Sequence, residues 1–216
     1  MISTLKKIVR RIDRSSPYPF FYPLIMSKNE KKALDNILKK TTKYLEFGAG
    51  GSTIRALRKS KAEIHCVESS KPWIEYMRNY FPIRHFENKR LHFHLVDIGK
   101  TKLWGYPEDD SSKHLFPEYS SGIFKSLDPQ TIDTFFIDGR FRVACALSVI
   151  LHTHSFDTSN TKILIHDFSE REHYQAVLKY FDVIEMVDTL AILRIKEDIN
   201  IQEVEKDYEM YKFDSR

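Results

Sequence analysis

The chain has 216 residues, of which 42% are hydrophobic and 30% charged, and its formal net charge is +4. This length suits one domain of ordinary size, and the composition excludes a disordered, fibrous or disulfide-rich protein. The small net charge permits an anionic partner but does not require one. No apolar run is long enough to cross a membrane and residues 1–14 lack the apolar centre of a signal peptide, so we expect a cytoplasmic protein.

Residues 1–28 are expected to form a segment of their own. Apolar residues recur there at helical spacing among basic ones, at Leu5, Ile8, Val9 and Ile12. This pattern predicts a short basic amphipathic helix that lies on the domain or a partner, with peripheral membrane contact through residues 3–14 as the alternative. A stiff aromatic connector follows at residues 17–24. The next helix is predicted at residues 27–40, because Ser27 and Glu30 match a capping box.

Strand-like and helix-like runs alternate in the main domain, residues 29–198. Strands are predicted at residues 44–47, 63–68, 91–96, 134–137, 162–166, 183–187 and 191–195. Helices are predicted at residues 53–60, 71–80, 143–152 and 172–180. The alternation predicts an α/β fold: a doubly wound, Rossmann-like sheet of seven mostly parallel strands. Only three residues separate the last two strands, so the final strand is expected to run antiparallel to its neighbour.

Two segments stand outside this alternation. Residues 99–128 are polar, contain Trp104 and Tyr106, and are expected to form an insertion over the site. Long irregular segments in compact domains often serve as lids or binding loops. Residues 199–216 are charged and are predicted to form a helical tail.

A glycine-rich turn follows the first predicted strand, in the run Tyr-Leu-Glu-Phe-Gly-Ala-Gly-Gly-Ser-Thr at residues 44–53. Glycines at 48, 50 and 51 allow positive φ and a close approach of the backbone to a ligand. Ser52 and Thr53 stand where a new helix exposes unpaired N–H groups, which suit an anion. Glu68 ends the next strand and can accept both hydroxyls of a ribose, so the ligand is expected to carry a nucleoside.

The glycine pattern argues against a dinucleotide. A dinucleotide fingerprint needs G-x-G-x-x-G/A, and the sixth position here is Thr53. Glu46 also stands two residues before the turn. An acid is poorly placed beside a pyrophosphate, but it suits a ligand with an ammonium group.

The run E-F-G-A-G-G-S-T resembles the first motif of class I S-adenosylmethionine-dependent methyltransferases, and the resemblance extends over about residues 43–195. It implies that S-adenosylmethionine is the cofactor. Glu68 matches the acid that holds the ribose, and Asp97 the position that contacts the adenine in many members. The cofactor-binding residues implied are Glu46, Phe47, Gly48, Gly50, Ser52, Thr53, Glu68 and Asp97.

A second group of candidates follows the fourth and fifth predicted strands. Asp138 comes after one strand and His166–Asp167 after the next, so all three are expected to meet at one edge of the sheet. The arrangement is similar to small-molecule O-methyltransferases of the catechol and macrolide-sugar kinds. The resemblance implies that Asp138, His166 and Asp167 are catalytic and that Asp138 and Asp167 hold Mg or Mn. Arg140 replaces a histidine common in those relatives. The alternative is that the aspartates cap helices or pair with nearby arginines.

Four residues are candidates for substrate binding: Arg140, Arg142, Trp104 and His173. Guanidinium groups can clamp a carboxylate or phosphate, and salt bridges to nearby acids are the alternative. His92 and His94 alternate along one strand and face the same side. No third ligand is near them in the sequence, so they are interpreted as structural.

The leading hypothesis is an O-methyltransferase acting on a hydroxyl of a small polar acceptor, such as a sugar of a glycan or glycolipid. The sugar follows from the resemblance alone. A nucleic-acid methyltransferase is the first alternative, but a basic stripe is missing and thirty acidic residues balance the charge, so no nucleic acid is expected. The second alternative is a non-catalytic binding or scaffold domain. The oligomeric state is left open.

Overall fold

The computed structural model describes residues 2–216, with side chains from Lys6 onward, so the predicted contribution of Leu5 to the amphipathic stripe lies outside the described residues. The seven strands found there are β1 (Lys43–Phe47), β2 (Glu63–Glu68), β3 (Leu91–Leu95), β4 (Thr134–Ile137), β5 (Lys162–Ile165), β6 (Phe181–Val187) and β7 (Leu190–Ile195). The α-helices are α1 (Ile2–Arg14), α2 (Lys28–Leu38), α3 (Gly51–Lys59), α4 (Lys71–Met77), α5 (Phe81–Phe86), α6 (Pro117–Ser121), α7 (Arg142–Thr153) and α8 (Ile201–Tyr211).

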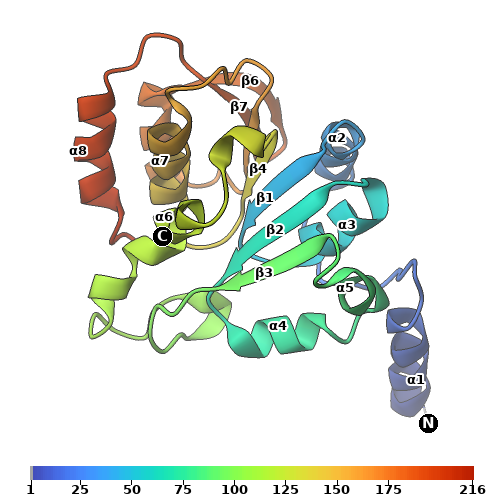
Figure 1. The fold of residues 1–216 in the computed structure, drawn as a ribbon. Helices are drawn as coiled ribbons and strands as arrows, with labels where there is room; N and C mark the ends of the chain where they lie inside the picture. Colours follow the sequence, from blue (N-terminus) through green and yellow to red (C-terminus); the bar gives the residue numbers. More distant parts are fainter. Residues whose placement is uncertain (1) are drawn as a thin grey trace.

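The strands form one sheet in the order β3-β2-β1-β4-β5-β7-β6 (Figure 1). The first five strands pair in parallel, whereas β7 is antiparallel to both β5 and β6. The predicted Rossmann-like sheet with an antiparallel last strand is therefore confirmed. Its physical basis is the short β6–β7 connection, which leaves no room for a crossover helix.

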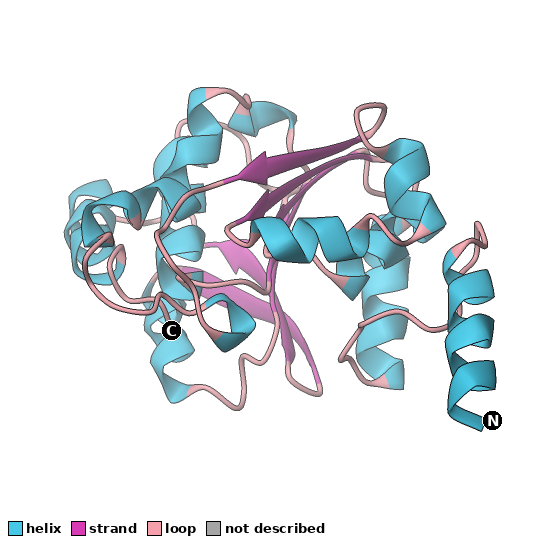
Figure 2. Cartoon of the chain, turned by 90° about the horizontal axis from the view of Figure 1, so that it is seen from below, coloured by secondary structure: helices cyan, strands magenta, loops and turns pink. Residues whose placement is uncertain are grey.

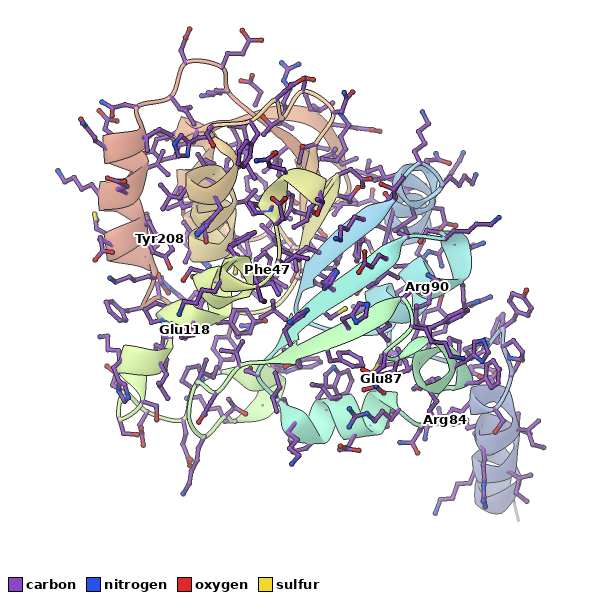
Figure 3. All side chains as sticks on the ribbon, viewed as in Figure 1. Phe47, Arg84, Glu87, Arg90, Glu118 and Tyr208 are labelled. Atoms are coloured by element: carbon purple, nitrogen blue, oxygen red, sulfur yellow. The ribbon has the colours of Figure 1, made fainter. Side chains whose placement is uncertain are left out.

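Two hydrophobic cores cover the two faces of the sheet, and Figure 2 shows helices on both sides of the strands. Along β1, Leu45 and Phe47 face one core with α6, α7 and α8, while Tyr44 faces the other with α2 to α5. This alternation is what a central strand buried on both faces requires. Tyr208 of α8 ties the first layer together through a 3.0 Å hydrogen bond between its hydroxyl and that of Ser120 in α6 (Figure 3).

The capping box predicted for α2 is confirmed. The backbone N–H of Glu30 donates to Ser27 Oγ at 3.1 Å, and the N–H of Ser27 donates to Glu30 Oε2 at 2.7 Å. The other oxygen of Glu30 accepts from the N–H and hydroxyl of Thr189, between β6 and β7. These hydrogen bonds hold the buried Glu30 side chain next to the ends of the central strands.

Three predicted helices differ from the observed ones. The helix expected at residues 71–80 ends earlier, at Met77, and a helix that was not predicted, α5, begins at Phe81 with Pro82 in its first turn. Residues Glu172–Lys179 form a 3-10 helix, and α3 begins two residues earlier than expected, at Gly51. The insertion is also partly helical: it contains α6 and three short 3-10 segments at residues 103–105, 113–115 and 122–125.

Helix α1 extends away from the sheet at one end of the molecule (Figure 1). It is attached through Arg14, whose guanidinium donates to the Tyr76 hydroxyl at 2.9 Å and lies over the Tyr76 ring. Ile8, Val9 and Ile12 are exposed, so membrane contact through this helix stays a prediction. Across residues 2–216, the helices lack the length and apolar character that crossing a membrane requires.

Candidate active site

The strand register brings the predicted site residues to one edge of the sheet. Phe47 pairs with Val67 on one side and with Ile137 on the other, and Ile137 pairs with Ile165. The residues that follow these partners are Gly48, Glu68, Asp138 and His166. They consequently stand side by side where the parallel strands end, which is where ligands bind in open α/β sheets.

The glycine turn after β1 is shaped by a close backbone crossing. Gly48 has φ +97°, and its N–H donates to the carbonyl of Val67 at 2.8 Å. A Cβ at Gly48 would lie 2.5 Å from the Cα of Gly139, so the turn after β1 touches the turn after β4. Gly50, in contrast, has extended backbone, and the side chain of Phe47 lies in the hydrophobic core. The positive φ expected of this turn is therefore found at Gly48.

Glu46 is fully buried behind the glycine turn. Its Oε2 accepts from the Thr53 hydroxyl at 2.6 Å, and Thr53 Oγ1 in turn accepts from the N–H of Gly50 at 2.9 Å. Glu46 Oε1 has no hydrogen-bond partner anywhere in residues 2–216. Burial raises the pKa of Glu46 to about 7, although the hydrogen bond from the Thr53 hydroxyl opposes this shift. A buried acceptor without a donor is costly unless a ligand supplies one.

The raised pKa of Glu46 predicts a pH dependence of stability. Because the pKa is about 7 in the folded chain and near 4.5 when unfolded, the folded state keeps a proton that the unfolded state releases between these values. Wild-type stability should consequently fall, relative to Glu46→Gln, by about 3 kcal/mol as the pH rises from about 5 to about 8. Urea unfolding of both proteins across this range measures the difference, and parallel curves would contradict the assignment.

Glu68 is buried at the end of β2 and already faces several donors. Its Oε1 accepts from the N–H groups of Ser69 and Ser70, each at 2.8 Å, and its Oε2 accepts from that of Ala49 at 3.2 Å. Burial raises the pKa of this carboxyl, and the backbone donors limit the rise. Trp73 donates to the carbonyl of Ala49 at 2.7 Å, which fixes α4 against the glycine turn. Asp97 is exposed after β3 and accepts from the nearby N–H of Gly99.

Asp138, His166 and Asp167 converge as predicted. His166 Nδ1 lies 3.2 Å from Asp138 Oδ1 and 3.4 Å from Asp167 Oδ1. Arg142, only 4% exposed, forms ion pairs of 3.2 Å with both aspartates. Its guanidinium also donates to the carbonyls of Asp138, Gly139 and His166. Arg142 therefore forms salt bridges to nearby acids, which was the alternative to substrate binding that the sequence left open.

His166 is enclosed by acidic groups. Its Nε2 lies 3.6 Å from Glu30 Oε2, a neighbour that the sequence could not reveal across 136 positions. Burial lowers the pKa of His166, but the hydrogen bond and charge of Asp138, followed by the charges of Asp167 and Glu30, raise it overall. Asp167 has a positive φ of +55°, a strained conformation that is common at functional sites.

The insertion reaches this edge of the sheet through aromatic residues. The buried hydroxyl of Tyr119 in α6 accepts from the N–H of Arg140 at 3.4 Å. Tyr106 lies under the Arg140 guanidinium at 4.1 Å, and the Nε and Nη1 atoms of Arg140 are buried without a hydrogen-bond partner in the described chain. Trp104 is exposed on the same insertion. His173 is half-buried against Tyr174, which itself packs under Arg142.

No family model and no curated protein sequence matches this chain. Several solved structures, however, are similar to it. A methyltransferase-like protein from Silicibacter pomeroyi superposes with a TM-score of 0.75 at 24% identity, over 90% of this chain and 98% of that one. A Podospora anserina methyltransferase bound to S-adenosylhomocysteine gives 0.50 at 18% identity, over 80% of each chain. With the observed strand order, these likenesses show that the chain has the Rossmann-like fold of S-adenosylmethionine-dependent methyltransferases.

Proposed function

We propose that the chain is an S-adenosylmethionine-dependent O-methyltransferase acting on a hydroxyl of a small polar acceptor. The observation that carries this proposal is the buried Glu46, whose Oε1 lacks a partner in the described residues beside the glycine turn. That oxygen can accept from the ammonium of the cofactor's methionine part. Glu68, two positions beyond the β2 residue that pairs with Glu46, can accept from the ribose hydroxyls.

The cofactor, when bound, supplies an electrophilic methyl group on a sulfonium, so the protein has to orient the acceptor and take up its proton. We assign proton uptake to Asp138. Its side chain is 26% exposed, and its contacts with Arg142 and His166 use Oδ1, which leaves Oδ2 to face the acceptor. The cofactor held at Glu46 and Glu68 would supply the methyl group, and the Asp138 carboxylate would take up the hydroxyl proton of the acceptor.

His166 is better suited to positioning than to touching the acceptor. It is buried, and its two ring nitrogens face Asp138 and Glu30. Its raised pKa keeps a proton available for the Asp138 carboxylate, which fixes the orientation of that group. We therefore place Asp138 and Asp167 at the acceptor and His166 behind them.

The three side chains form a donor set that a metal ion could use, since their ligand atoms lie within 4.8 Å of one another. However, the buried Arg142 guanidinium already bridges the two carboxylates that would bind Mg or Mn. A divalent ion there would have to share its ligands with an adjacent fixed positive charge. The arrangement does not fit a metal, and we propose that Arg142 supplies the counter-charge instead.

The acceptor is proposed to lie under the insertion. Arg140 presents buried, unpaired donors there, at least among the residues described, and Trp104 lies exposed nearby in the same segment as Tyr106. An arginine with spare donors favours an acceptor with an anionic or strongly polar group. Saccharides and their acidic or phosphorylated derivatives are the first acceptor class to test. His173 and Arg140 are the first positions to substitute in tests of acceptor specificity.

Calorimetric titration with S-adenosylmethionine and S-adenosylhomocysteine tests the proposal. We expect binding that weakens at least about tenfold in Glu46→Gln and in Glu68→Gln, since each loses a charge-assisted hydrogen bond. Glu205→Gln, at an exposed position of α8, should bind as the wild type does. Absence of binding at millimolar ligand would refute the cofactor assignment. Formation of S-adenosylhomocysteine with RNA but with no small acceptor would refute the acceptor class alone.

A further inference from the structure

A group of histidines lies on the β2–β3 end of the sheet, away from the glycine turn. His65 of β2 pairs in register with His92 of β3, and Val67 pairs with His94. Because side chains alternate along a strand, these histidines and Glu63 all face the same side. Figure 1 shows α6, α7 and α8 gathered over the other half of the sheet. From the sequence, His92 and His94 were interpreted only as a structural pair, because Glu63 and His65, which lie beside them, belong to a different strand.

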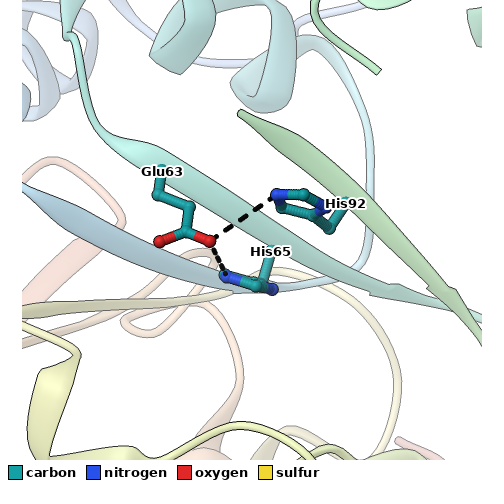
Figure 4. A group of neighbouring side chains, drawn as sticks. All are labelled: Glu63, His65 and His92. Atoms are coloured by element: carbon teal, nitrogen blue, oxygen red, sulfur yellow. Dashed lines mark ion pairs between the residues drawn. The ribbon is translucent and has the colours of Figure 1, made fainter. Parts of the chain in front are cut away.

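The side chains of Glu63, His65 and His92 point toward one another (Figure 4). Glu63 Oε1 lies 3.3 Å from His65 Nε2 and 3.6 Å from His92 Nε2, and all three ligand atoms lie within 4.8 Å of one another. Bonds of about 2.0–2.1 Å to a tetrahedral Zn²⁺ place neighbouring ligand atoms about 3.3–3.4 Å apart. The two distances from Glu63 Oε1 are thus close to the distance between corners of a zinc tetrahedron.

His65 carries a second, independent sign of a missing ligand. The side chain is only 7% exposed, and its Nε2 has no well-aligned hydrogen bond within the described chain. Its Nδ1 lies 3.0 Å from His94 Nε2. If Nδ1 donates there, the lone pair of Nε2 faces the negative Glu63 oxygen with nothing between them. A cation at that point would satisfy both groups.

One cationic side chain already contacts this cluster. Lys43 lies 3.3 Å from Glu63 Oε2, which is the oxygen that the proposed site does not use. Glu63 Oε1 is therefore left for the two histidines and a metal ion.

We propose that Glu63, His65 and His92 form a zinc-binding site, with solvent or a small ligand at the fourth position. His94 accepts from the ring N–H of His65 and so orients it, as hydrogen-bond partners of metal-bound histidines commonly do. The half-exposed side chains of Glu63 and His92 provide the entry path. A metal here would bind the edge strand β3 to β2. It lies apart from the candidate active site, since Glu63 begins the strand that Glu68 ends.

Titration of the tag-free, metal-stripped chain with Zn²⁺ by calorimetry, and with Co²⁺ by visible absorption, tests this site. We expect one Zn²⁺ per chain, intense tetrahedral Co²⁺ bands that Zn²⁺ displaces, and a rise of a few degrees in melting temperature with Zn²⁺. His92→Ala and Glu63→Gln, at partly exposed positions, should fold and weaken Zn²⁺ binding at least about tenfold.

Two control variants locate the metal. His154→Ala removes an exposed histidine and should leave Zn²⁺ affinity unchanged. Asp167→Asn alters the group formed by Asp138, His166 and Asp167, and it should also leave the Zn²⁺ affinity and the Co²⁺ spectrum unchanged. No Zn²⁺ binding by the wild type would overturn the proposal, as would binding lost in Asp167→Asn but retained in His92→Ala. S-adenosylmethionine affinity should be the same in His92→Ala and wild type.

Discussion

Gly48→Ala is expected to lower the free energy of unfolding by about 3–5 kcal/mol. Gly48 has a φ of +97°, which strains any residue with a Cβ, and that Cβ would lie 2.5 Å from Gly139 Cα. Gly139 is itself closely packed, since a Cβ added there would clash with the buried hydroxyl of Tyr119 in α6. Urea unfolding, followed by circular dichroism, measures the loss.

Gly50→Ala is the matched control for this prediction, because it changes the same turn by the same atom. Gly50 has extended backbone, and the nearest atom to its Cβ position is Ser52 Oγ at 3.9 Å. The free energy of unfolding should change by less than about 1 kcal/mol. Equal losses in the two variants would show that the turn is sensitive to any side chain, and that the crossing at Gly139 is not the cause.

The sheet could be predicted from the sequence because its strands are short, apolar and regularly separated. The run at 134–137 and the run at 162–165 are buried on both faces, and such runs admit few interpretations. Helix details were less accessible. Pro82 can start a helix as well as interrupt one, and the pattern after Tyr80 did not reveal that a second helix begins at Phe81. The 3-10 geometry at residues 172–179 likewise depends on tertiary packing.

The part of the candidate site that could be predicted from the sequence is the part whose residues directly follow the parallel strands. Asp138 and His166 were expected to meet because adjacent parallel strands end at one edge, and they do. Glu30 was missed as a site neighbour because its capping role explains it fully within α2. The cluster around Glu63 was missed for a related reason. Its members alternate on two strands almost thirty positions apart, and only the register of β2 and β3 brings them together.

Removal of Arg142 from the candidate site should affect both stability and activity. Its guanidinium, almost without solvent contact, donates to three carbonyl oxygens and two carboxylates. This guanidinium, together with the neighbouring His166 ring, offsets the mutual repulsion of the two carboxylates. The lysine substitution cannot replace it, because an ammonium lacks the planar fork that reaches both aspartates.

Arg142→Met is therefore expected to lower the free energy of unfolding by about 3–5 kcal/mol, and Arg142→Lys to recover only part of this loss. Arg194→Met is the matched control: it removes an arginine paired with Asp182 at 3.6 Å, where both side chains are 48% exposed, and should cost less than about 1 kcal/mol. Denaturant unfolding measures all three. If Arg142→Met is no less stable than Arg194→Met, the two aspartates do not depend on Arg142. If, instead, Arg142→Met loses stability and turnover and Mg²⁺ restores both, the guanidinium occupies a place that a metal can fill.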